Sequence, residues 1–364
     1  MYYNPVKVVE TNNWREQYVI FQEKLKIHNP LIITTNGNLK RHDILDFFDS
    51  SSIFSTVKPN PTFEDCKVAI AFSEKSEFDG VIAIGGGSVM DMAKVIMASM
   101  GTGIHNLPEL FNITDPNDKI VPSIFVPTTH GTGSEVTMWG TIWNIVEKKK
   151  YSISNPSLYP SVAILDSNLT LSLPLKISII TVMDALSHSF EAIWNKNANS
   201  KSTDYAIEAI SLILQNIEAL KLNPVDVRLR SRLLRAANLA GLAFSNTKTA
   251  AAHSMSYPLT IHYGVPHGVA SSITLVSLLE INASSISNVL EKIYIAVNLV
   301  GLQDLIKKIK SIPANIVSYR LKDWCIKKDD INWLVDQSFT KGRMDNNIVE
   351  LTKNDVHYIL KSLY

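Results

Sequence analysis

Short apolar runs alternate with helix-like segments along the first half of the chain. PLIITT (30–35), IVPSIFVPTT (120–129) and SVAILD (161–166) are rich in β-branched residues and predict strands, and a turn-like NGN follows the first of them. GVIAIGGGSVMDMAKVIMASM (80–100) predicts a strand, a tight turn and then a helix. Strands that alternate with helices predict βαβ units in a parallel sheet, with ligands bound at the ends of its strands.

The pattern changes near LTLSLPLK (169–176). Beyond it, apolar residues recur every three or four positions, as in DYAIEAISLILQNIEAL (204–220) and RLRSRLLRAANLAGLAF (228–244), which predicts successive amphipathic helices. We therefore expect an α/β domain with a Rossmann-like parallel sheet over residues 1–176 and an all-α domain over residues 177–364. A chain of 364 residues is long enough for two such domains.

The composition is typical of a soluble globular protein and narrows the choice of partners. Apolar residues make up 46% of the chain and charged residues 19%, and the net charge of +1 argues against a nucleic-acid partner. We see no run as long as a membrane span and no apolar signal-peptide core. The two cysteines lie far apart, which suits a reducing compartment. We expect a cytoplasmic protein that binds neither nucleic acid nor membranes.

Three glycines, Gly85 to Gly87, directly follow an apolar strand pattern. Without side chains, this turn would let a phosphate approach the main chain, and the start of the next helix would offer N–H groups and a partial positive charge. Ser88 could cap that helix, with Asp91 in the acidic position of a capping box. A second polar loop, VPTTHGTGSEVT (126–137), leaves another strand, and the two loops together predict the walls of a dinucleotide groove. Because the GxGxxG fingerprint is absent, a turn without a ligand stays an alternative.

Asp184 and His188 stand four positions apart in an otherwise apolar helix, so their side chains project from one face. A buried carboxylate needs compensation of its charge, although a surface pair or a helix cap would also explain these residues. His253, His262 and His267 follow within fifteen positions of one another. We predict that Asp184, His188, His253 and His267 surround Fe²⁺ or Zn²⁺, because this set is too rich in nitrogen for Mg²⁺ or Ca²⁺. His262 stays outside the set, as a proton relay or a packed side chain.

Taken together, several segments resemble the iron-containing (group III) alcohol dehydrogenases. They occur in the order of that family and cover nearly the whole chain: PNPT (59–62), GGGSVMDMAK (85–94), PTTHGTGSEVT (127–137), DALSHSFEA (184–192), HSMSYPLTIHYGVPHG (253–268) and RMDNNIVELTKNDV (343–356). The resemblance implies the dehydroquinate synthase-like fold of that family, with an N-terminal dinucleotide-binding domain and a C-terminal helical domain.

The resemblance also implies an NAD(P)-dependent oxidoreductase that acts on a small alcohol or aldehyde, assembled as a homo-oligomer (a dimer). It implies that the metal is held by the same four side chains. The residues that it implies for contact with NADPH or NADH are Asn60, Gly86, Gly87, Ser88, Asp91, Thr128, Thr129, Thr137 and, on the weakest local match, Lys150.

Two departures from the family pattern bear on the proton path and the coenzyme. Many relatives carry a second histidine four residues after the third ligand, where this chain has Tyr257, so the candidate catalytic residues are His267, His262 and Tyr257. NADH-preferring relatives place an aspartate at the end of the first strand, and Asn36 is nearest to that place here. Loss of that carboxylate, with Lys40 and Arg41 just beyond, favours NADPH, unless the two cations only solvate a helix start.

Within the family, THGTGSEVTMW (129–139), KKYSISNPSLYP (149–160) and SNTKTAAAHS (245–254) resemble the phosphonoacetaldehyde reductases. A phosphonate needs charged or N–H donors, and the candidates are His130, where many relatives have alanine or serine, and Lys248. Lys248 would lie about 140° around a continuous helix from His253, so a surface lysine is an equal alternative. The competing functions are reduction of uncharged aldehydes, such as lactaldehyde or butanal, and a non-redox cyclase resembling dehydroquinate synthase.

Overall fold

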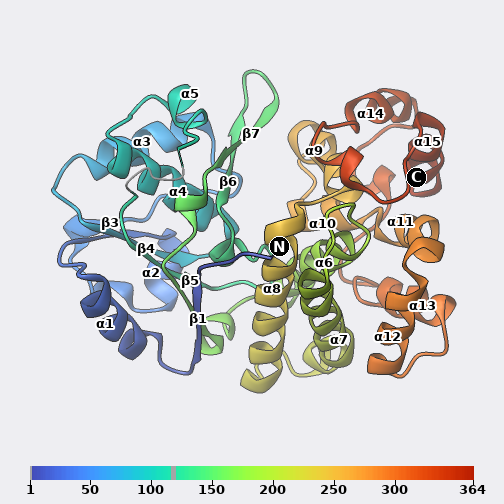
Figure 1. Cartoon of the computed structure of the whole chain (residues 1–364), viewed down its shortest axis with the longest axis horizontal. Coiled ribbons are helices and arrows are strands. Elements are labelled where there is room, and N and C mark those ends of the chain that lie inside the picture. The colour runs from blue at the N-terminus through green and yellow to red at the C-terminus, as the bar shows by residue number, and fades with distance from the viewer. Residues whose placement is uncertain (1, 116–119) are drawn as a thin grey trace. The chain divides into compact units, whose positions relative to one another are not determined.

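The computed structural model describes residues 2–115 and 120–364 (Figure 1). The chain forms two compact units. The α/β unit comprises Asn4–Thr129 and Gly133–Leu173, and the helical unit comprises Met1–Tyr3, His130–Thr132 and Pro174–Tyr364. Three residues of the polar loop, His130–Thr132, therefore group with the helices rather than with the sheet.

The α/β unit is built on a parallel sheet with the order β1-β8-β5-β4-β2-β3. Its strands are β1 (Lys7–Thr11), β2 (Pro30–Ile33), β3 (Ile53–Phe54), β4 (Gly80–Gly85), β5 (Ser123–Pro127) and β8 (Val162–Asp166). The chain runs from β2 to the edge strand β3 and returns on the other side of β2 as β4. The carboxyl ends of β2 and β4 therefore border a topological switch point, where open parallel sheets bind ligands. The predicted fold class and the four predicted strands are confirmed.

Both faces of this sheet are buried, as the apolar runs require. Along β4, Val81 and Ala83 belong to one core cluster, while Ile82 and Ile84 belong to the cluster on the opposite face. The helices of this unit are α1 (Trp14–Leu25), α2 (Asn36–Arg41), α3 (Phe63–Ser73), α4 (Gly87–Thr102) and α5 (Leu107–Leu110), and β6 (Trp139–Asn144) pairs antiparallel with β7 (Lys149–Ser154).

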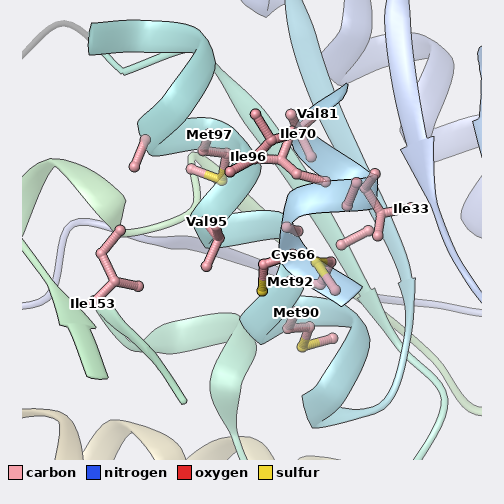
Figure 2. Close-up of a cluster of buried hydrophobic side chains, with 14 of the residues drawn as sticks. Ile33, Cys66, Ile70, Val81, Met90, Met92, Val95, Ile96, Met97 and Ile153 are labelled. Atoms are coloured by element: carbon pink, nitrogen blue, oxygen red, sulfur yellow. The ribbon is translucent and has the colours of Figure 1, made fainter. Parts of the chain in front are cut away.

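The first of these clusters holds α4 in place. Figure 2 shows side chains of α4, Met92 and Ile96 among them, gathered with Cys66 of α3 and Val81 of β4. All four side chains are at most 1% exposed. The packing orients the helix that begins at the glycine turn.

The prediction of a turn at NGN is wrong, because Asn36 opens α2. Thr35 is the N-cap residue of this helix, and its hydroxyl accepts a hydrogen bond from the N–H of Asn38 (3.1 Å). A cap of this kind compensates for the low helix propensity of asparagine and glycine.

The helical unit contains the amphipathic helices that the sequence predicts. Its helices are α6 (Leu175–Ile193), α7 (Ser200–Leu222), α8 (Val227–Thr247), α9 (Ala251–Tyr263), α10 (His267–Ser272), α11 (Leu275–Asn282), α12 (Ser287–Val297), α13 (Leu302–Ser311), α14 (Ile331–Gln337) and α15 (Lys353–Ser362). In Figure 1, α7 and α8 run beside α6, with which both are in contact. The α6 helix thus lies inside the unit and buries residues from Ser178 to Ile193 on most of its sides.

One stretch of the helical unit, His267–Val297, is long and apolar enough to cross a bilayer, by length and composition only. The prediction that no run reaches the length of a membrane span is therefore wrong. However, 61% of its most apolar window is buried within the protein, and the stretch is divided among α10, α11 and α12. Burial of this degree is typical of a core segment, so the stretch is weak support for a membrane span.

Candidate active site

The first two predicted metal ligands lie on one face of α6. Asp184 and His188 are 2% and 4% exposed, and Nδ1 of His188 lies 3.9 Å from Oδ1 of Asp184. The polar pair sits in a helix whose other buried positions are largely apolar, such as Ala185, Leu186 and Phe190. The surface-pair alternative is therefore wrong, since the carboxylate is inside the unit.

Two further elements bring histidines to the same carboxylate oxygen. Nε2 of His253, on α9, lies 3.5 Å from Oδ1 of Asp184, and Nε2 of His267, at the start of α10, lies 3.8 Å from it. Potential ligand atoms of Asp184, His188 and His253 all lie within 4.8 Å of one another. These three form the tightest group, and His267 adjoins it at Asp184.

The electrostatics of this group fit a divalent cation. Burial alone raises the pKa of Asp184, but the charges of His188 and His267, with those of His253, outweigh it and hold the pKa well below the usual range. The carboxylate is thus ionised. The buried Nε2 of His253 has no hydrogen-bond partner among the described residues, and a metal ion would satisfy it.

The exposed fraction differs between the four candidate ligands. The side chain of His267 is 28% exposed, whereas those of Asp184, His188 and His253 are at most 5% exposed. A small molecule would therefore reach these side chains from the His267 side.

His267 is placed by a close approach of α10 to α6. A Cβ atom at Gly268 would lie inside van der Waals contact with the backbone carbonyl oxygen of Ile180, one turn before Asp184. Backbone cannot rotate away as a flexible side chain could, so only glycine fits here without a shift of the helices.

Gly268→Ala is expected to weaken metal binding about 10-fold and to lower stability by about 1–3 kcal/mol, because α10 must move away from α6. Chelator competition with Zn²⁺ and thermal unfolding measure the two effects. Gly301→Ala is the matched control, since an added Cβ there would meet open space within the described structure. Equal metal affinity in the two variants would show that the close approach does not position His267.

The glycine turn forms the N-terminus of α4 at the switch point of the sheet. Gly86 is the N-cap residue, so the prediction that Ser88 caps this helix is wrong. The hydroxyl of Ser88 instead accepts a hydrogen bond from the N–H of Asn60 (3.1 Å). A Cβ atom at Gly86 would lie 3.0 Å from Cγ2 of Thr129, so a larger residue there would press on that side chain, just beyond the end of β5. The main chain of α4 thus begins without a side-chain cap, as an anion site requires.

Charged and hydroxyl groups surround this turn. Burial raises the pKa of the partly buried Asp91, against the opposing charges of Lys94 and Lys150. The N–H of Thr128 donates to the carbonyl of Gly85 (3.0 Å), which joins β5 to the turn. Thr137 is buried, and its hydroxyl accepts a hydrogen bond from Lys94 (2.9 Å).

At the end of β2, Asn36 is exposed, and its Oδ1 accepts a hydrogen bond from the hydroxyl of Ser55 (2.7 Å). Lys40 and Arg41 are exposed in the last turn of α2, so they are solvated at the end of a helix and not at its start. Nη1 of Arg41 lies 3.3 Å from Oδ1 of Asn38. Asn36 comes shortly after β2, and the glycine turn comes at the end of β4. These are the two strands that border the switch point.

The two candidate substrate residues lie in different surroundings. His130 is fully buried, and neither ring nitrogen has a hydrogen-bond partner in the described parts of the chain. Burial, with the nearby Arg230, lowers the pKa of His130 to about 3, so the imidazole is neutral and offers an N–H group but no charge. Lys248 is exposed and follows the end of α8 with φ 65°, so the prediction that it shares a helix with His253 is wrong.

The neutral His130 makes stability depend on pH. An unfolded histidine binds a proton near pH 6.5, so wild-type stability is expected to fall, relative to His130→Gln, as pH decreases from about 6.5 toward 3. At about pH 5 the extra loss should reach about 2 kcal/mol. Denaturant unfolding at several pH values measures it, and substitution of the exposed His28 is the control. Parallel pH curves for wild type and His130→Gln would contradict the assignment.

The two candidate proton donors on α9, Tyr257 and His262, lie on different faces of the helix. Tyr257 is half-buried one turn after His253 and so lies on the same face of the helix. His262 lies nine positions after His253, about 180° around the helix, and its ring packs edge-on against Trp333 (4.6 Å between ring centroids). This geometry favours the packed-side-chain alternative for His262.

Three functional candidates escaped the sequence analysis: Lys94, Glu191 and Ser271. The hydroxyl of Ser271 donates to Oδ1 of Asp184 (2.7 Å). Lys94 and Glu191 are both fully buried. Each is a charged residue in a helix whose other positions are largely apolar, which is the same signal that revealed Asp184.

The chain is similar to one family along nearly its whole length. The model described as "Iron-containing alcohol dehydrogenase" matches residues 5–167, and the model described as "Fe-containing alcohol dehydrogenase family, C-terminal" matches residues 178–364.

Individual relatives support the same family. Long-chain-alcohol dehydrogenase 1 of Geobacillus thermodenitrificans is 34% identical over 62% of this chain and 57% of its own. Phosphonoacetaldehyde reductase of Streptomyces viridochromogenes is 32% identical over 62% of this chain and 59% of its own. These matches thus span less than two thirds of either relative.

Among solved structures, sulfoacetaldehyde reductase from Bifidobacterium kashiwanohense, in complex with NAD+, superposes with a TM-score of 0.90. The sequence identity is 27%, and the match covers 100% of this chain and 98% of that one. The predicted family is confirmed: this chain belongs to the iron-containing alcohol dehydrogenases.

Proposed function

We propose that the protein is a metal-dependent, NAD(P)H-linked aldehyde reductase and alcohol dehydrogenase. The observation that carries the proposal is the convergence of Asp184, His188, His253 and His267 at one buried carboxylate oxygen. The uncapped start of α4 at the switch point of the sheet supports binding of a dinucleotide.

The four side chains would hold Fe²⁺ or Zn²⁺ through one carboxylate oxygen and three imidazole nitrogens. When bound, the cation supplies Lewis-acid polarisation of a carbonyl and the reduced nicotinamide supplies the hydride. Aldehyde, NAD(P)H and one proton give alcohol and NAD(P)+. Burial of Asp184 and His253 keeps water from one side of the centre, while the partly exposed His267 leaves the other side accessible.

The remaining proton must come from this chain or from water. Tyr257 is the preferred candidate, because it lies one turn after His253 on the same face of α9, whereas His262 packs on Trp333. We assign Tyr257 to the proton path on this ground.

The proposed substrate is phosphonoacetaldehyde, reduced to 2-hydroxyethylphosphonate. The likeness to one phosphonoacetaldehyde reductase and one sulfoacetaldehyde reductase supports a two-carbon aldehyde with an anionic group. Because His130 is neutral and buried, the charge on such a substrate would have to be met by other donors, and the exposed Lys248 is the candidate that the sequence offers.

Phosphonoacetaldehyde is expected to be reduced with a kcat/KM about 10- to 100-fold above that of butanal, since a charge-assisted hydrogen bond contributes about 1.5–3 kcal/mol. Absorbance of the reduced coenzyme measures the rates, with NADPH and NADH compared in parallel. Sulfoacetaldehyde, which carries a singly charged sulfonate in place of the phosphonate, is the control for an anionic group, and lactaldehyde is an uncharged control.

A higher kcat/KM for butanal or lactaldehyde would favour the uncharged-aldehyde alternative, to which the likeness with a long-chain alcohol dehydrogenase points. Failure of every aldehyde to oxidise the coenzyme would favour a non-redox cyclase. A cytoplasmic location and a homodimer stay predictions, which fractionation and sedimentation would test.

A further inference from the structure

Glu191 is a fully buried carboxylate on the helix that carries the first two metal ligands. It lies three positions after His188 and seven after Asp184, which places it within about 20° of Asp184 around α6. A charge at 0% exposure must be compensated by hydrogen bonds or by other charges. The contacts of Glu191 therefore indicate its structural role.

All the contacts of Glu191 that we identify are with the start of α9. Oε1 accepts the N–H groups of Ala250 (3.0 Å) and His253 (3.1 Å), and Oε2 contacts Nδ1 of His253. The N-cap residue of α9 is Ala250, which has no side-chain acceptor, so a carboxylate from α6 takes the role of the cap.

The contact with the ring selects one form of His253. An ionised carboxylate only accepts hydrogen bonds, so Nδ1 must carry the proton, and in a neutral imidazole the lone pair is then on Nε2. Nε2 is the atom that lies 3.5 Å from Oδ1 of Asp184. The metal-facing nitrogen is therefore the one able to bind a cation.

We propose that Glu191 is a positioning residue of the metal centre: it fixes the tautomer and the ring orientation of His253 and anchors α9 to α6. Partners of this kind raise the basicity of an imidazole ligand and commonly change metal affinity 10- to 100-fold. The inference rests on the metal centre of the proposed function.

Glu191→Gln is the sharpest test. Its amide oxygen can keep both backbone N–H groups, while its NH₂ group then faces Nδ1 as a donor, which forces the proton of His253 onto Nε2. The affinity for Zn²⁺ alone, measured by chelator competition, is expected to fall about 10- to 100-fold while the metal-free variant stays folded. Glu208→Gln is the matched control. Glu208 lies exposed on α7 and pairs with Arg235, so this variant should bind Zn²⁺ as wild type does.

The outcomes separate the inference from the proposed function. Wild-type affinity in a folded Glu191→Gln variant would reduce Glu191 to a helix cap and overturn the inference alone. Failure of the wild-type protein to bind Zn²⁺ would overturn both. If Glu191→Gln does not fold, ¹⁵N NMR of the wild-type Zn²⁺ form decides: a protonated Nδ1 on His253 supports the inference, and an unprotonated Nδ1 refutes it.

Discussion

Asp184→Ala is expected to remove bound metal and turnover together. Oδ1 of Asp184 is the shared centre of the site, 3.5–3.9 Å from a nitrogen of each of the three histidines. Without this carboxylate, three neutral imidazoles would have to hold a dication with no negatively charged ligand among them. Metal affinity should fall by more than the roughly 100-fold typical when a residue that only supports a metal ligand is lost, and activity should fall below about 1%. Elemental analysis of the purified variant and coenzyme oxidation measure the two effects.

The control for Asp184→Ala is the same substitution at Asp204, which is exposed on α7. This control should retain wild-type metal content and rate, because it removes only a solvated carboxylate. Normal turnover by a metal-free Asp184→Ala protein would refute the proposed centre.

Lys94→Met is expected to lower the free energy of unfolding more than Gly268→Ala does. The ammonium of Lys94 is fully buried and hydrogen-bonds to the carbonyl and hydroxyl oxygens of Ser134, the hydroxyl of Thr137 and the carbonyl of Trp139, at 2.7–2.9 Å. Burial lowers the pKa of Lys94 to about 8, and the negative charges of Asp91 and Glu135 oppose that shift.

Methionine preserves the volume of Lys94 but leaves these oxygens and both carboxylates without their cation. Breaking a buried charge network in this way costs about 3–5 kcal/mol, or about 10 °C in melting temperature for a unit of this size. Coenzyme binding should weaken as well, since the loop around Ser134 is tied through Lys94 to the helix that begins at the glycine turn. Calorimetry and a coenzyme titration would measure both changes.

Lys67→Met on the neighbouring α3 is the matched control for Lys94→Met. Its ammonium pairs with Glu64 on the surface, where both side chains are at least 60% exposed, so its removal should cost under about 1 kcal/mol. Equal melting temperatures for the two variants would show that the buried network contributes nothing to stability.

Local pattern was enough to predict on which face of a helix two candidate metal ligands lie and where four strands run. The spacing of Asp184 and His188 placed both on one helical face, and β-branched runs identified four strands of the sheet. These predictions succeed because side-chain direction within one helix or strand follows from its period alone.

Three predictions that depended on where a helix begins or ends were wrong. Thr35 turns NGN into the start of α2, Gly86 rather than Ser88 caps α4, and a break after Thr247 separates Lys248 from the helix of His253. Helix ends are decided by a few hydrogen bonds between the chain and its caps, which the apolar periodicity does not encode.

The motifs and the apolar pattern were sufficient for the family, the fold class and the types of side chain that can bind a metal. That His253 presents Nε2 to Asp184 while Glu191 contacts Nδ1, and that His130 is buried and neutral, became clear from the folded chain. Tautomers and pKa values depend on burial and on partners that are distant in the sequence. Glu191, for example, contacts Ala250 and His253, which lie 59 and 62 positions further along the chain.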